Sequence, residues 1–133
     1  YPGKPLVHSI QIDTNPFTIG EVNIQPVMVD HGDMPIFGYR IGSLAYITDA
    51  KTLPPESMDA LRDLDVLILN ALRFEPHKTH LNVEEAIRLC HELKPRQCYL
   101  THISHEMGLH DEVNAMLPEN ISLAYDGLVV KIR

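Results

Sequence analysis

The stretch from Val66 to Leu72 most constrains the fold, because it is a nearly continuous apolar run. A strand with one solvent-exposed face alternates apolar and polar residues, whereas a continuous apolar run is typical of a strand covered on both faces. Helix and strand patterns alternate after this run, and strand patterns predominate before it. The chain is therefore expected to be an α/β (α+β) protein with a mixed sheet.

The residues before Asp49 predict several strands and turns. Leu6 to Asp13 alternates apolar and polar residues and indicates a half-exposed strand, and Pro26 favours an edge position or a bulge in its own run. The other expected elements are short strands at 17–19 and 22–29, a loop at 31–35, and a hairpin of 37–41 with 44–48 around Gly42-Ser43.

The residues after Asp49 predict three helices separated by strands. Asn82 with Glu85 three residues later is a capping-box pattern, and Pro95 ends the helix that it begins. The other expected elements are helices at 55–64 and 106–117, a strand at 97–103, and a closing hairpin of 121–125 with 128–132 around Asp126-Gly127.

Composition limits the class of protein. The chain has 133 residues, enough for one modest domain, and a formal net charge of −7, which argues against broad binding to a nucleic-acid backbone. It has neither an apolar run of roughly 20 residues nor the pattern of a signal peptide at its start. Cys90 and Cys98 match no disulfide framework, so a cytoplasmic location is expected.

Polar residues that can bind metal lie at the ends of the predicted elements. His31 follows one strand, Asp49 another, and His102 lies near the end of a third, with His80 directly before a helix and His105 three residues after His102. Imidazole and carboxylate groups are ligands for zinc, manganese and iron, and strand ends are where an α/β fold places its site.

These residues also have simpler interpretations. Asp49 could be only a helix N-cap, and a lone histidine in a loop is more often solvated than bound to a metal. His8 and His91 are interpreted as solvated side chains, and His77 as a loop residue beside Pro76. Spacing alone leaves a metal site plausible and no more.

Five motifs, in order and at matching spacing, resemble the metallo-β-lactamase superfamily, and within it the PhnP-like phosphodiesterase branch. The motifs are His31-Gly32 with Phe37-Gly38-Tyr39-Arg40, Ala45-Tyr46-Ile47-Thr48-Asp49, Thr79-His80, Tyr99-Leu100-Thr101-His102-Ile103-Ser104-His105, and Ala124-Tyr125-Asp126-Gly127. The family's upstream His-x-His-x-Asp-His motif is absent from this sequence. Residues 1–133 therefore resemble a single partial domain, the C-terminal half of an αββα sandwich, and a start at Tyr1 rather than Met fits a piece of a longer protein.

The resemblance implies a role for each candidate residue. His31 and His102 would be metal ligands, Asp49 the carboxylate that bridges two metal ions, and His80 the general acid at the leaving group. His105 would bind the substrate phosphate. The complete enzyme would hold two divalent ions, Zn or Mn, while this chain alone, with three ligands, would hold one or none.

The expected function is a metal-dependent hydrolase, a phosphodiesterase acting on a small or cyclic phosphodiester through a site that a missing N-terminal half completes. Two alternatives stay open: another hydrolase of this fold, acting on a thioester, a lactam or an RNA 3′ end, and a non-catalytic fragment that only binds metal or assembles. We expect negligible turnover from this chain alone. We also expect no membrane or nucleic-acid partner, and a homo-oligomer formed through the exposed apolar sheet face.

Overall fold

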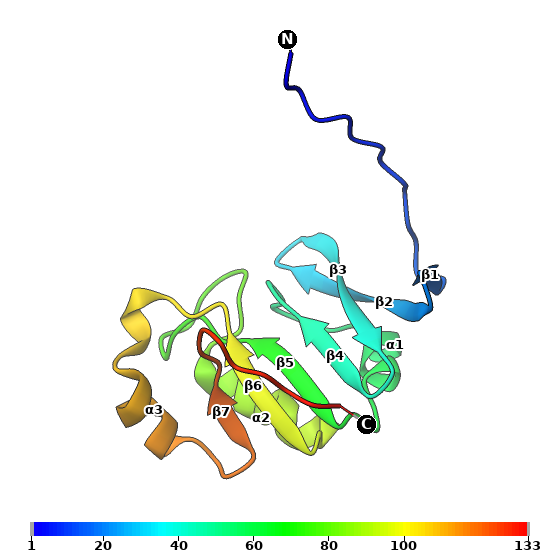
Figure 1. Cartoon of the computed structure of the whole chain (residues 1–133). Coiled ribbons are helices and arrows are strands. Elements are labelled where there is room, and N and C mark those ends of the chain that lie inside the picture. The colour runs from blue at the N-terminus through cyan, green and yellow to red at the C-terminus, as the bar shows by residue number, and fades with distance from the viewer. Residues whose placement is uncertain (1, 133) are drawn as a thin grey trace.

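The computed structural model describes residues 2–132, which form one mixed sheet in the order β1-β2-β3-β4-β5-β6-β7. The first four strands pair antiparallel, and β4 to β7 pair in parallel (Figure 1). The strands are β1 Phe17–Ile19, β2 Val22–His31, β3 Met34–Ile41, β4 Leu44–Ile47, β5 Val66–Asn70, β6 Gln97–Thr101 and β7 Ile121–Leu123. The helices are α1 Pro55–Ala60, α2 Val83–Leu93 and α3 His110–Met116, with a 3₁₀ turn η1 at His105–Met107. The expected α/β fold is confirmed.

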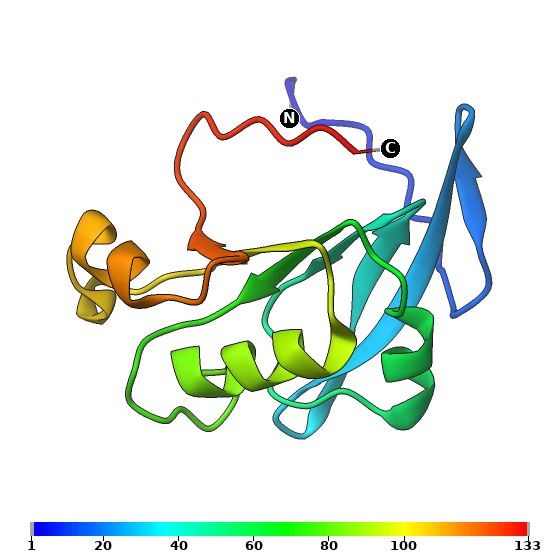
Figure 2. The ribbon, with the colours of Figure 1, turned by 90° about the horizontal axis from the view of Figure 1, so that it is seen from below.

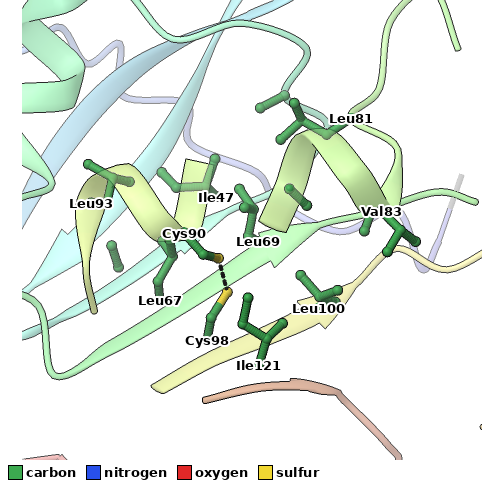
Figure 3. Packing of buried hydrophobic residues seen from close by; sticks show 14 of the residues in the cluster. Ile47, Leu67, Leu69, Leu81, Val83, Cys90, Leu93, Cys98, Leu100 and Ile121 are labelled. Carbon is green, nitrogen blue, oxygen red and sulfur yellow. Dashed lines mark hydrogen bonds between the residues drawn. The ribbon is translucent and has the colours of Figure 1, made fainter. Parts of the chain in front are cut away.

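The core lies between the sheet and the helices on one of its faces. Helices α1 and α2 lie beneath the sheet in Figure 2, and α3 packs beside β7 at the end of the sheet. Leu67 and Leu69 of β5 and Leu100 of β6 are fully buried against α2 (Figure 3). Cys90 of α2 and Cys98 of β6 are free thiols in this layer, with sulfur atoms 2.7 Å apart. None of the helices within residues 2–132 has the length and hydropathy of a membrane span.

The opposite face of the sheet carries a row of aromatic and apolar side chains in register. Tyr39, Tyr46, Ile68 and Tyr99 are Cα partners across β3 to β6. Tyr46 is 43% exposed. No helix among the described residues covers this face (Figures 1 and 2), so helices cover the sheet on one face only. The association expected through this face stays a prediction.

Two of the predicted strands are wrong. Residues 6–13 form no strand and run away from the sheet as an exposed segment (Figure 1), because no neighbouring strand pairs with their alternating pattern. The expected closing hairpin also fails, since residues 128–132 form no strand beside β7. They pass instead over the face of β5 and β6 that is opposite the helices (Figures 1 and 2).

Several other elements differ from prediction in their extent, among them β6 and β7, which end two residues earlier than expected, at Thr101 and Leu123. The expected loop at 31–35 is a two-residue turn, in which His31 pairs with Met34, so β2 and β3 form one hairpin. Helix α1 ends at Ala60, where the Arg40 guanidinium donates to the carbonyls of Ala60 and Arg62 at 2.7 Å each. The helix expected at 106–117 is interrupted at Gly108, whose φ of +105° is incompatible with a helix.

Several predictions from local sequence patterns hold. Strands β3 and β4 form the hairpin around Gly42-Ser43, and Pro26 lies on β2 beyond the last pairing with β1, at the edge of the sheet. Asn82 caps α2 through a complete capping box: its side chain accepts from the Glu85 amide at 2.9 Å, and the Glu85 carboxylate accepts from the Asn82 amide at 2.9 Å.

We expect Asn82→Ala to lower the free energy of unfolding by about 1–2 kcal/mol, because the α2 N-terminus then loses its side-chain acceptor. The Asn82 side chain also donates to the Phe74 carbonyl, which adds to the loss. Urea denaturation followed by circular dichroism measures the change. Asn82→Ser is the matched control, since serine keeps a cap acceptor, and an equal loss in both variants would contradict the capping argument.

Candidate metal and catalytic site

Four of the predicted site residues meet at one edge of the sheet. His31 is the last residue of β2, Asp49 lies two residues after β4, and His102 follows β6 directly. His80 comes from the loop before α2. Parallel neighbours of a sheet bring their carboxyl ends to the same edge, and the antiparallel β2 ends there as well.

The Asp49 carboxylate lies at the centre of the cluster. Its Oδ1 is 3.0 Å from His80 Nε2 and 3.2 Å from His102 Nε2. The rings of His80 and His102 are stacked with centroids 4.9 Å apart, and His31 meets the His80 ring edge-on at 4.8 Å. One carboxylate oxygen thus faces two imidazole nitrogens, with a third imidazole beside them.

The backbone at Asp49 and His102 is in an uncommon conformation. Both residues have φ of +58°, in the left-handed region that side chains other than Asn, Asp and His seldom adopt. Each follows the carboxyl end of a strand, so the reversal of the backbone turns the side chain toward the common centre.

The backbone after Asp49 is held by a buried amide. Asn70, fully buried at the end of β5, accepts from the Ala50 amide at 2.9 Å and donates to the Ala50 carbonyl at 2.8 Å. The Leu81 amide donates to the same carbonyl at 2.9 Å. Ala50 and Leu81, the residues that follow Asp49 and His80, are therefore hydrogen-bonded through the Ala50 carbonyl oxygen. This bond fixes the Asp49 and His80 side chains relative to each other.

The hydrogen bond of His31 determines which of its nitrogens can bind a ligand. His31 Nδ1 lies 2.8 Å from the Asp49 carbonyl, and a carbonyl only accepts, so Nδ1 donates. Nε2 of the neutral ring then keeps its lone pair. Histidines that bind metals usually donate their other N–H in this way.

The donor atoms suit a divalent metal ion. One ligand atom each from His31, Asp49 and His80 lie within 4.8 Å of one another, and His102 reaches the same carboxylate oxygen. Nitrogen and carboxylate oxygen are ligands for Zn²⁺ and Mn²⁺. The chemistry of the site therefore fits a metal centre.

The charge state of Asp49 follows from its neighbours. Partial burial alone raises the pKa of the carboxyl group, but the hydrogen bond from His80 and the electrostatic interactions with His102, His80 and His31 outweigh it. The pKa of Asp49 therefore lies below its usual value, and the side chain is a carboxylate at neutral pH.

The interpretation of Asp49 as a helix N-cap is wrong, because α1 begins after Pro54 without a side-chain cap and the Asp49 side chain bonds to histidines. His8 and His91 are exposed, as expected for solvated histidines. His105 lies on η1, exposed to solvent, and no contact with His31, Asp49, His80 or His102 is found for it within residues 2–132. Its proposed place near the substrate phosphate stays a prediction.

His77, which the sequence predicts to be only a loop residue, belongs to the cluster. Its Nδ1 lies 3.2 Å from His80 Nδ1, and their ring centroids are 4.9 Å apart. The signal in the sequence is that His77 and His80 are three positions apart, with Lys78-Thr79 between them. That spacing alone does not show that a loop folds back on itself.

Comparison with known proteins identifies the family. A family model described as the beta-lactamase superfamily domain matches residues 3–103, about three quarters of the chain. The chain belongs to this superfamily. The crystal structure of a new diphosphatase from the PhnP family is 41% identical, with a TM-score of 0.89 over 92% of this chain and 48% of that chain. The chain is thus a PhnP-like member of the metallo-β-lactamase superfamily, as its motifs predicted.

Two further proteins are similar to this chain, one at lower sequence identity and one over a small part of its length. The metallo-beta-lactamase fold protein YhfI from Bacillus subtilis, at 23% identity and a TM-score of 0.71, shares the fold over 90% of this chain and 54% of that chain. An octanoyltransferase from Porphyromonas gingivalis is 35% identical over 96% of this chain but only 26% of its own length. The chain spans about half or less of each of these three proteins.

Proposed function

We propose that this chain carries part of the active site of a metal-dependent phosphodiesterase that acts on a small or cyclic phosphodiester. The observation that carries the proposal is the meeting of His80 and His102 on one oxygen of Asp49, with His31 beside them. The PhnP-family relative, 41% identical to this chain, is named a diphosphatase, and this name supports chemistry at phosphorus for the proposal.

His31, Asp49 and His102 would hold metal, with Asp49 as the shared carboxylate. Divalent ions held there would lower the pKa of a bound water and neutralise charge on the phosphate oxygens. Two of these residues are held in place. The Asp49 carbonyl orients the His31 ring, and the two hydrogen bonds of Asn70 to the Ala50 backbone fix the position of Asp49. The remaining ligands of a two-ion site would come from the part of the domain that this chain does not contain.

His80 is the candidate general acid. Its side chain is only 13% exposed, and its Nε2 faces the Asp49 oxygen that the metal ligands share. A proton on Nε2 can pass to an alkoxide leaving beside this point, and imidazole suits the step because its ordinary pKa is close to neutral. Since His80 is also within metal-binding distance, its role as acid and its role as ligand require an experiment to separate them.

The test uses the full-length domain, meaning a polypeptide that contains this chain and the preceding half of a metallo-β-lactamase domain. We expect it to hydrolyse bis(p-nitrophenyl) phosphate and a cyclic ribose phosphate in the presence of Zn²⁺ or Mn²⁺, and to lose activity when a chelator removes the metal. His91→Ala, an exposed histidine on α2, should leave the rate unchanged. Hydrolysis of a thioester or lactam without hydrolysis of either phosphodiester would contradict the proposal.

A further inference from the structure

The loop before α2 places the edges of two imidazole rings against each other. His80 Nε2 faces Asp49, so Nδ1 lies on the opposite side of the ring and points back into its own loop. There it lies 3.2 Å from His77 Nδ1 and 3.1 Å from the Thr79 hydroxyl. From this arrangement we infer that His77 is a positioning residue for His80: His77 Nδ1 accepts the hydrogen on His80 Nδ1 and holds the His80 ring with Nε2 toward the reaction centre. This inference rests on the proposed function.

The hydrogen bonds of His77 show that its Nδ1 is an acceptor. The Thr79 backbone amide lies 3.2 Å from His77 Nδ1 and can only donate, so that nitrogen presents its lone pair to the inside of the loop. A lone pair on His80 Nδ1 at the same distance would repel it. The contact is favourable when His80 Nδ1 carries a hydrogen.

The chemistry of a general acid requires the same arrangement. An imidazole that gives up a proton from Nε2 carries hydrogens on both nitrogens before the step. The hydrogen on Nδ1 then needs an acceptor, since an unpaired, partly buried donor is costly. His77 Nδ1 and the Thr79 hydroxyl are the acceptors that the loop supplies.

His77 is suited to remain the acceptor. Partial burial, together with the electrostatic interactions with His80, Arg73 and Lys51, lowers the pKa of His77. The loop itself is anchored, because Arg73 donates to the Pro76 carbonyl at 3.0 Å and pairs with Glu106 at 3.1 Å. On the other side of the loop, the turn at Gly32 packs against Thr79. A Cβ added at Gly32 would lie 3.0 Å from the methyl carbon of Thr79.

The first experiment observes the His80 ring directly in the 133-residue chain without metal. In ¹³C-labelled protein, we expect the ring signals of His80 to be sharp in the wild type and in His77→Asn, whose amide oxygen can replace Nδ1 as acceptor. In His77→Ala they should shift and broaden, because the ring can then rotate. His91→Ala should leave them unchanged. Identical His80 signals in the wild type and in His77→Ala would overturn the inference.

The second experiment measures turnover by the full-length domain. We expect His77→Ala to lower kcat at least about tenfold for a substrate with a poor leaving group, with metal content and KM nearly unchanged, and His77→Asn to recover most of the loss. An active wild type with an equally active His77→Ala variant would show that His77 does not position His80. A wild type that hydrolyses no phosphodiester would refute the proposed function instead, and the ring signals would still decide the pairing.

Discussion

Asp49→Asn is expected to abolish both metal binding and hydrolysis in the full-length domain. The carboxylate is the one anionic group in the cluster of His31, His80 and His102, and its Oδ1 is the atom at which two of these histidines meet. An amide keeps an oxygen in the same place but has no charge, and it is a much poorer ligand for Zn²⁺ or Mn²⁺. Metal content by mass spectrometry and turnover of bis(p-nitrophenyl) phosphate measure the two losses.

Asparagine is a sharper substitution here than alanine. Residue 49 has φ of +58°, a conformation that asparagine tolerates and that costs alanine about 1–2 kcal/mol. Asp49→Asn therefore removes the charge without straining the backbone. His91→Ala is the control for the loss of a titratable side chain, and full metal content in Asp49→Asn would show that the carboxylate is not a ligand.

The same substitution has a pH signature in the metal-free chain. The pKa of Asp49 is lowered on folding, so its carboxylate stabilises the fold above the unfolded-state value of about 3.9, and this stabilisation is lost as the pH falls through the lower, folded-state pKa. Asp49→Asn should therefore be less stable than the wild type near neutral pH and equally stable in strong acid. The difference is within about 1 kcal/mol, because the side chain is 37% exposed.

The parts of the fold that the sequence predicted depend on local patterns. The capping box of Asn82 and Glu85 is formed by neighbouring residues, and the hairpin around Gly42-Ser43 needs only its own two strands. The segments 6–13 and 128–132 carry the same alternating pattern, yet neither becomes a strand. A strand needs a neighbour to pair with, and alternation alone does not say whether one is present.

The residues of the candidate site were likewise predicted only in part. Motif resemblance singled out His31, Asp49, His80 and His102, and the fold brings all four together. It could not show how they are held, because the positive φ at Asp49 and His102 and the clamp of Asn70 on Ala50 depend on tertiary structure. His77 was missed for the same reason.

His80→Ala is expected to lower turnover of the full-length domain about 10²–10⁴-fold while leaving its metal content nearly unchanged. The reason is that His80 is placed as the acid, with Nδ1 held by His77 and Thr79 and with Nε2 toward the shared carboxylate oxygen. Metal content separates this role from the alternative. A loss of one ion per site in His80→Ala would make His80 a ligand, since its nitrogen lies within 4.8 Å of the donor atoms of His31 and Asp49.

The size of the loss should depend on the leaving group. A p-nitrophenolate leaves readily without a proton, so bis(p-nitrophenyl) phosphate should be affected least by His80→Ala. A ribose alkoxide needs its proton as the bond breaks, so a cyclic ribose phosphate should be affected most. Comparing kcat for the two substrates in the wild type, His80→Ala and His91→Ala measures this difference. Equal losses for both substrates would remove the general-acid role from His80, although the residue would remain part of the site.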